Sequence, residues 1–183
     1  MAPAHNTSPV ILNIATSLDG YIARTNGDVS WLDAMDDADE DYGMGAFMTS
    51  VSSLIMGSHT YEAIVELGLE HWPYDTNSFV LSHRNLAVPW EGITVMNESA
   101  SRVVNHCRSQ GDGAIWLVGG AEVVASFLAS DLIDIMIISV VPVTLERGIS
   151  LFTSTPMDES FMHVDSKHFN NGLLQLRYER TER

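Results

Sequence analysis

The segment IWLVGGAEVVASFLASDLID, residues 115–134, is the stretch from which the fold can be inferred. Residues 114–118 are an apolar run that predicts a buried strand, and residues 121–129 have the spacing of a helix that follows it. Gly119 and Gly120 lie between the two. Glycine lets the backbone turn tightly and approach a ligand, and a helix N-terminus attracts anions. The segment by itself is compatible with a phosphate site and equally with a turn that needs glycine only for its geometry.

Two further strand ends carry small polar residues. The first is MGSHTYE, residues 56–62, where a strand over 53–57 is followed by a helix over 60–66. The hydroxyl groups of Ser58 and Thr60 could bind a phosphate, or one of them could simply cap the helix. In VLSHR, residues 80–84, a strand over 78–82 is followed by a histidine and an arginine. Ligands bind at the carboxyl ends of parallel strands, so three such ends predict one shared site.

The remaining periodicity predicts an α/β protein. Because short apolar runs alternate with helical stretches, we expect three layers, α/β/α, with a mostly parallel central sheet. Asn170-Asn171-Gly172 joins two alternating segments, 161–169 and 173–180, as an antiparallel C-terminal hairpin would. The other expected elements are strands over 10–16, 21–23, 93–96 and 135–143 and helices over 39–50 and 99–108.

Composition limits the class of protein. The 183 residues are 45% hydrophobic and 18% charged, which predicts a single domain over 1–183 with a core of about 9–180. A net charge of −15 disfavours nucleic acid and anionic membranes as partners. The most apolar stretch, 132–143, is too short to span a bilayer, and the N-terminus does not have the pattern of a signal peptide. A single cysteine, Cys107, fits a reducing compartment, so we predict a cytoplasmic location.

The acidic run 28–41 contains seven carboxylates and could suggest a calcium loop, since Asp37, Asp39 and Asp41 alternate. However, Tyr42 stands where such a loop needs glycine, and Met48 where it needs glutamate. The histidines have no metal-ligand spacing either. We therefore predict a solvated acidic loop and no metal.

Taken together, these motifs resemble the dihydrofolate-reductase-like superfamily, most closely the branch related to the C-terminal reductase domain of bacterial riboflavin biosynthesis, RibD. The resemblance runs from Val10 to Tyr178. Besides the three strand ends, it rests on SLDGYIA at 17–23, GDVSWL at 27–32 and PVTLERGISLF at 142–152. It implies a reductase that transfers hydride from NADPH, with NADH as the alternative, to a small pterin- or pyrimidine-like heterocycle. Both a folate reductase and a reductase of 5-amino-6-(5-phosphoribosylamino)uracil remain open at this point.

The resemblance also implies a coenzyme site. Ala15 and Ile22 would flank the nicotinamide, and the other expected contacts are Gly57, Ser58, Thr60, Leu81, Ser82, His83, Arg84, Val118, Gly119, Gly120, Ala121, Glu122 and Val123. The family commonly has an arginine directly after the glycine of MGxxTYE, where this chain has Ser58. Arg84 would therefore carry more of the preference for the 2′-phosphate of NADPH.

On the substrate side, Asp41 lies sixteen residues before Gly57, the spacing at which folate reductases place one buried carboxylate. A carboxylate there can help to protonate the substrate beside the point of hydride attack, so Asp41 is the catalytic candidate, with a structural role as the alternative. Asp19 and Trp31 are candidate substrate contacts. The stretch 57–83 has no arginine or lysine to bind the glutamate tail of folate, so we expect dihydrofolate to be a poor substrate.

Two other classes of function remain open: a catalytically silent nucleotide-binding or sensor protein on the same fold, and a structural domain without a ligand. The chain lacks the Cys and His set of a zinc deaminase, so we expect the reductase part alone. Relatives in this branch commonly pair, and the segment 135–143 and the hairpin offer apolar surface. We therefore expect a homodimer with two-fold symmetry.

Overall fold

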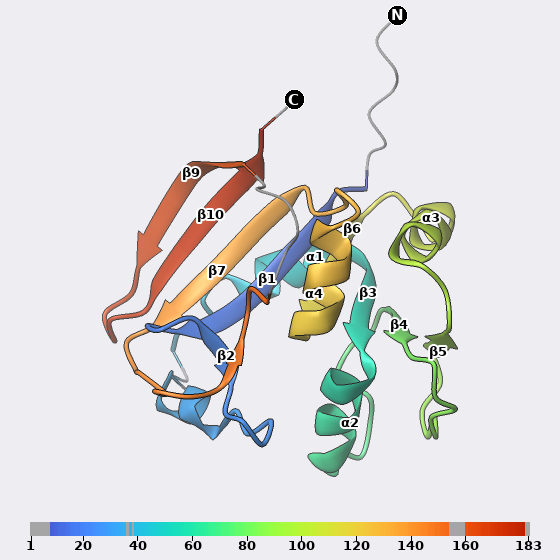
Figure 1. The fold of residues 1–183 in the computed structure, drawn as a ribbon, viewed down its shortest axis with the longest axis horizontal. Coiled ribbons are helices and arrows are strands. Elements are labelled where there is room, and N and C mark those ends of the chain that lie inside the picture. The colour runs from blue at the N-terminus through green and yellow to red at the C-terminus, as the bar shows by residue number, and fades with distance from the viewer. Residues whose placement is uncertain (1–7, 36, 38, 154–159, 182–183) are drawn as a thin grey trace, which may run out of the picture.

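The computed structural model describes residues 8–181 except 36, 38 and 154–159. Eight strands form one twisted sheet in the order β5-β4-β3-β6-β1-β7-β10-β9 (Figure 1). The first six of these are parallel to one another, and β10 and β9 continue the sheet antiparallel. The strands are β1 (Val10–Ser17), β2 (Tyr21–Ala23), β3 (Val51–Gly57), β4 (Asn77–Leu81), β5 (Ile93–Met96), β6 (Ala114–Gly119), β7 (Ile135–Val141), β8 (Ile149–Ser150), β9 (Phe161–His168) and β10 (Leu174–Arg180).

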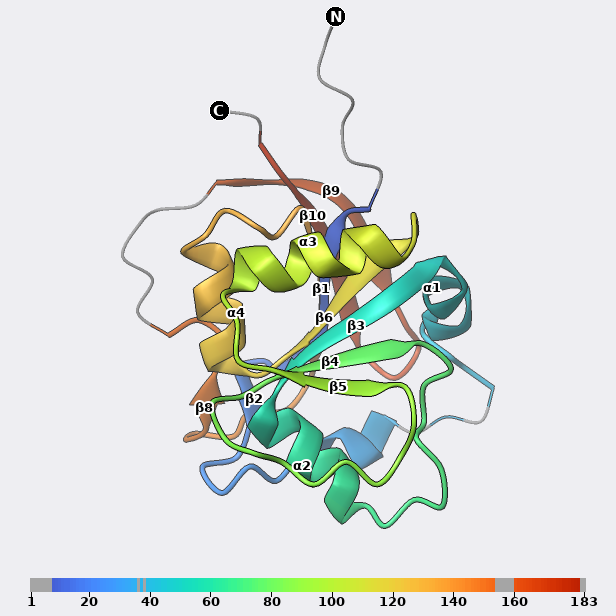
Figure 2. The same cartoon turned by 90° about the vertical axis from the view of Figure 1, so that its right-hand side faces the viewer.

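Helices lie on both faces of this sheet, as the three-layer prediction requires. They are α1 (Met44–Ser50), α2 (Ser58–Glu66), α3 (Ala100–Gln110), α4 (Ala121–Leu128) and the short 3-10 helix η1 (Ser30–Met35). Successive residues of a strand point to opposite faces, so Ile115 and Leu117 pack into the main core with α3 and α4. Trp116 between them meets Phe47 of α1 on the other face. Figure 2 shows α3 and α4 on one side of the sheet and α1 on the other.

The predicted elements correspond to the observed ones, with one substantial correction. The helix expected over 39–50 begins only at Met44. Tyr42 and Gly43 have φ angles of 54° and 78°, in the left-handed region, so a right-handed helix cannot extend back through them. The strand expected over 135–143 ends at Val141, just before Pro142, which has no backbone N–H to donate to a ladder. Patterns in the sequence did not reveal η1 or β8.

A second, two-stranded sheet joins β2 to β8 beside the end of β1. The segment 21–23 is a strand as expected, but it pairs outside the main sheet. Two backbone hydrogen bonds tie the neighbouring loops together, from Leu18 N to Val143 O at 2.7 Å and from Leu151 N to Gly20 O at 3.1 Å. The loop after β7 is thereby attached to the turn after β1.

Within the described residues, no helix combines the length and the apolar character that crossing a membrane demands.

Candidate functional site

Four neighbouring parallel strands end at the same edge of the sheet. β4, β3, β6 and β1 end at Leu81, Gly57, Gly119 and Ser17, and they are adjacent in the order β4-β3-β6-β1 (Figure 1). The three glycine- or serine-containing strand ends singled out in the sequence are therefore neighbours in space. This edge is where α/β proteins bind ligands.

The N-termini of α2 and α4 meet at this edge. Their N-cap residues are Gly57 and Gly120, and neither helix has a side chain that caps it. The N–H group of Gly120 donates to Thr60 Oγ1 across 3.1 Å, which joins the end of β6 to the first turn of α2. The first N–H groups of a helix have no partner within the helix and carry a partial positive charge. Two such ends side by side can hold the oxygens of a diphosphate.

Glycine is required here partly for packing. A Cβ atom on Gly57 would lie 2.9 Å from Cγ2 of Val123, so β3 and α4 pack too closely for a side chain at this position unless Val123 shifts. Gly119 has a φ of +131°, which L side chains rarely adopt. Glycine at these two positions brings the turn after β3 close to the turn after β6. The absence of side chains there would also let a ligand approach the backbone.

Arg84 lies at the outer end of this edge, beyond β4. Its Nη2 donates to Ser58 Oγ at 3.0 Å and to Glu62 Oε2 at 2.8 Å. Its backbone N–H donates to Ser82 Oγ at 2.9 Å, which orients the turn. The hydrogen bond from Arg84 lowers the pKa of the Glu62 carboxyl, and Glu62 raises the pKa of Arg84 in turn. Sequence reasoning assigned no role to Glu62, although it is one helical turn after Ser58 on the same face of α2.

His83 completes this end of the site. Its Nδ1 lies 2.6 Å from Oδ1 of Asn97, which follows β5. The hydrogen bond joins the turn after β4 to the end of the neighbouring strand. Asn97 was not among the predicted site residues, because nothing local relates it to a histidine fourteen positions earlier.

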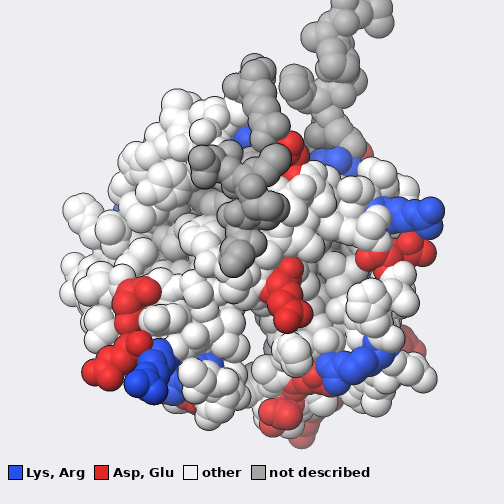
Figure 3. All heavy atoms as spheres, viewed as in Figure 1, with Lys and Arg blue, Asp and Glu red and all other residues white. Residues whose placement is uncertain are grey.

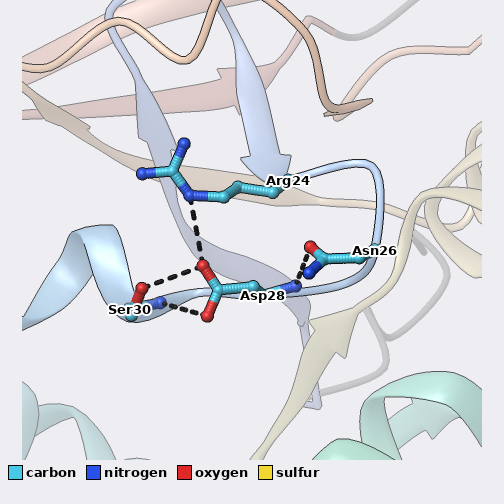
Figure 4. A network of polar contacts seen from close by, with 4 residues as sticks. All are labelled: Arg24, Asn26, Asp28 and Ser30. Atoms are coloured by element: carbon cyan, nitrogen blue, oxygen red, sulfur yellow. Dashed lines mark hydrogen bonds and ion pairs between the residues drawn. The ribbon is translucent and has the colours of Figure 1, made fainter.

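A cluster of polar side chains lies in the segment that joins β2 to η1. Arg24 Nε is 3.1 Å from Asp28 Oδ2, Ser30 Oγ donates to the same carboxylate at 2.8 Å, and Asn26 Oδ1 accepts from the Asp28 N–H at 3.1 Å (Figure 4). The bond from Ser30 is the main reason why the pKa of Asp28 is lowered. Figure 3 shows this face hollowed between the β2 side and the α2 side, with acidic and basic side chains on both rims.

Two of the other predicted coenzyme contacts, Ala15 and Ile22, pack against different hydrophobic clusters. Ala15 packs against the cluster around Trp31, whereas Ile22 packs against the main core with α3 and α4. The two are therefore not part of one cluster. Leu81 and Val118 are half-buried, Ala121 is buried, and Glu122 is exposed at the start of α4.

Asp41 is not the buried carboxylate that was expected. It is exposed, and it accepts hydrogen bonds from the N–H groups of Gly43 at 2.8 Å and Gly45 at 3.0 Å at the start of α1. These bonds lower its pKa, whereas a proton donor at neutral pH needs a raised pKa. The surroundings of Asp41 are those of the structural alternative, a carboxylate that binds the start of α1. In the described part of the chain, no three Asp, Glu, His or Cys side chains lie together as a metal site would need.

Asp19 and Trp31, the two substrate candidates, have different surroundings. Asp19 is exposed and already bonded, accepting from Ser17 Oγ at 2.6 Å and from the N–H groups of Leu145 and Glu146 at 3.1 and 2.9 Å. Trp31 is 6% exposed, and its indole N–H has no hydrogen-bond partner among the described residues. A buried donor without a partner is costly, so Trp31 is the better candidate to meet a polar atom of a ligand.

The mostly parallel sheet with its antiparallel C-terminal hairpin is an α/β fold of the reductase type. Residues 8–175 match the model of the RibD C-terminal domain family, and the chain belongs to that family. It is 34% identical over 171 residues, 93% of this chain and 97% of the relative, to the uncharacterized protein YwjB of Bacillus subtilis (strain 168). The resemblance inferred from the sequence is thereby confirmed.

Solved structures agree with this assignment. A putative riboflavin biosynthesis protein from Shewanella sp. PV-4 superposes with a TM-score of 0.86 at 31% identity, covering 95% of this chain and 99% of that one. A dihydrofolate reductase from Enterococcus faecalis, complexed with NADP(H), superposes with a TM-score of 0.68 at 17% identity, covering 95% and 97%. The second likeness concerns the fold alone.

Proposed function

We propose that this protein is a cytoplasmic, NADPH-dependent reductase that transfers hydride to a small pterin- or pyrimidine-like heterocycle. The observation that carries the proposal is the pair of uncapped helix N-termini, α2 and α4, joined by the hydrogen bond from Gly120 to Thr60. The Shewanella protein named for riboflavin biosynthesis and the reductase solved with NADP(H) add support, because both share the fold.

The residues at the sheet edge fit a dinucleotide. Backbone N–H groups after Gly57 and Gly120 would hold the diphosphate, and Ser58 and Thr60 add hydroxyl groups beside them. Arg84 would meet the ribose 2′-phosphate, next to His83 and Ser82. Ala15 on β1 and Ile22 on β2 are both half-buried, and each would border the nicotinamide from its own strand. When bound, the reduced nicotinamide supplies the hydride, and the chain contributes orientation and exclusion of water.

The substrate would lie toward Trp31. Its indole N–H is buried and has no hydrogen-bond partner among the described residues, so a carbonyl or ring nitrogen of a substrate that reached it would satisfy it. Asp19 holds the adjacent loop through Leu145 and Glu146. Since Asp41 is exposed with a lowered pKa, we propose that water supplies the proton. The stretch 57–83 contains no arginine or lysine for a glutamate tail, so uncharged or phosphorylated heterocycles suit this protein better than dihydrofolate.

Coenzyme binding is the first test. A ligand that binds only the folded state stabilises it by about 2.7 kcal/mol at a hundredfold excess over its dissociation constant, so NADPH should raise the melting temperature.

Arg84→Ala should weaken the binding of NADPH more than that of NADH, because only NADPH has the 2′-phosphate. Arg102→Ala is a matched control, since Arg102 also pairs with a glutamate on the surface, Glu98, but on α3. Absence of any shift with either coenzyme would contradict the proposal.

Turnover is the second part of this test. A panel of pterins, pyrimidines and dihydrofolate, followed by oxidation of NADPH, separates an enzyme from a silent nucleotide-binding protein. The surroundings of Asp41 favour the silent alternative, because the carboxylate expected to protonate the substrate is exposed and hydrogen-bonded to the start of α1. Binding of coenzyme without turnover of any acceptor would support that alternative.

A further inference from the structure

Arg84, the cation that the proposed function assigns to the 2′-phosphate, is already bound by an acid of the same protein. Its Nη2 lies 2.8 Å from Glu62 Oε2, and the same nitrogen contacts Ser58 Oγ at 3.0 Å. The Arg84 and Glu62 side chains are 54% and 38% exposed. Glu62 comes from α2 and Arg84 from the turn after β4, so a group that binds Nη2 of Arg84 meets a nitrogen that already donates to the carboxylate.

We propose that Glu62 sets the preference between NADPH and NADH by competing with the ribose 2′-phosphate for Arg84. This inference rests on the proposed function. A phosphate at Arg84 would share the guanidinium with a carboxylate of like charge, so binding of NADPH carries a repulsion that NADH avoids. A ribose 2′-hydroxyl, by contrast, can donate a hydrogen bond to a carboxylate, which is how many NAD sites are built.

The exposure of the pair determines how strong this competition is. An exposed ion pair contributes little to stability, so a phosphate can displace Glu62 from Arg84. The displaced carboxylate remains on the same turn of α2, because the helix backbone holds it there. Repulsion between charges a few ångströms apart in a solvated site changes affinity by about threefold to tenfold. Salt screens charges that are farther apart than about 10 Å at 0.1 M and about 3 Å at 1 M, so a repulsion across a few ångströms is largely lost only at about 1 M salt.

The experiment compares dissociation constants of NADPH and NADH in four proteins: wild type, Glu62→Gln, Glu66→Gln and Arg84→Ala. Glu62→Gln keeps the size of the side chain and a hydrogen-bonding oxygen but removes the charge. Glu66→Gln is the matched control, because Glu66 is exposed one turn later on the same helix. We expect Glu62→Gln to tighten NADPH by about threefold to tenfold, to leave NADH unchanged or weaker, and to lose most of this gain in high salt.

The possible results distinguish a failure of this inference from a failure of the proposed function. If Glu62→Gln weakens NADPH, the carboxylate positions Arg84 for the phosphate and the inference is overturned. An unchanged ratio of the two affinities, or a gain that persists in high salt, overturns it too, while binding of either coenzyme to the wild type leaves the proposed function intact. If the wild type binds neither coenzyme, the proposed function fails and the inference with it.

Discussion

The carboxylate of Asp19 joins parts of the chain that are 126 residues apart. It accepts hydrogen bonds from Ser17 next to it and from the backbone of Leu145 in the loop after β7. The bond from Ser17 is the first cause of its lowered pKa, and the backbone N–H groups of Leu145 and Glu146 add to it. The residue proposed from sequence as a substrate contact thus holds the loop whose Leu145 packs in the cluster around Trp31.

Asp19→Asn should reduce stability at neutral pH and make it less sensitive to acid. Because the folded-state pKa of Asp19 is lowered from 3.8, its contribution is present above that value and is lost as the pH falls through the folded-state pKa. Melting temperatures measured from neutral pH to below 3.8 should therefore converge for wild type and variant at the acid end. Asp33→Asn, an exposed carboxylate on η1, serves as the control. Parallel curves for Asp19→Asn and wild type would contradict this role.

At the scale of elements, the packing of β3 against α4 decides what the edge of the sheet can carry. Gly57 ends β3 with a φ of −81°, which any residue can adopt, so backbone conformation does not require glycine there. The requirement comes from Val123, whose Cγ2 would meet a new Cβ atom at 2.9 Å. The glycine in MGSHTYE therefore has a structural reason independent of any ligand.

Gly57→Ala should destabilise the fold by about 1–3 kcal/mol, the usual cost of overpacking. Val123→Ala removes the obstructing methyl groups, so the double variant should lose less than the sum of the two single variants. Urea unfolding of all four proteins measures this coupling. Strictly additive losses would show that Val123 is not the obstacle.

At the scale of the whole molecule, one end of the main sheet is poorly covered. β9 forms its outer edge (Figure 1), and every residue of that strand after Phe161 is exposed. Met162, Val164 and Leu174 are 58%, 39% and 37% exposed. A long, exposed edge strand with apolar side chains invites pairing with another strand. We propose that a second copy of the chain covers this end as a two-fold homodimer.

Light scattering coupled to gel filtration should then give about twice the chain mass of 20.1 kDa. Val164→Lys places a charge on the exposed strand and should shift the mass to that of one chain. Leu67→Lys is the control, because Leu67 is 68% exposed at the end of α2, away from this end of the sheet. A wild-type mass near 20.1 kDa at micromolar concentration would remove the proposal.

Local patterns in the sequence determined most of the fold. Apolar periodicity located the long strands and the helices α2 to α4, and Asn170-Asn171-Gly172 located the hairpin, because strands, helices and tight turns depend on residues a few positions apart. The three strand ends could be recognised for the same reason. The start of α1 was placed too early, since the left-handed conformations of Tyr42 and Gly43 leave no mark on apolar spacing.

Only the tertiary structure decided which partner each polar side chain has. Asp19 binds a loop 126 residues further along the chain, and Arg84 meets Glu62 from another element. Asp41 binds N–H groups only two and four residues further on, at the start of the following helix, and is exposed because of where the fold places that turn. The sequence does not distinguish a carboxylate that is buried from one that caps a helix or one that pairs with an arginine. Its protonation and its role depend on the groups that surround it in space, and those groups meet only when the chain has folded.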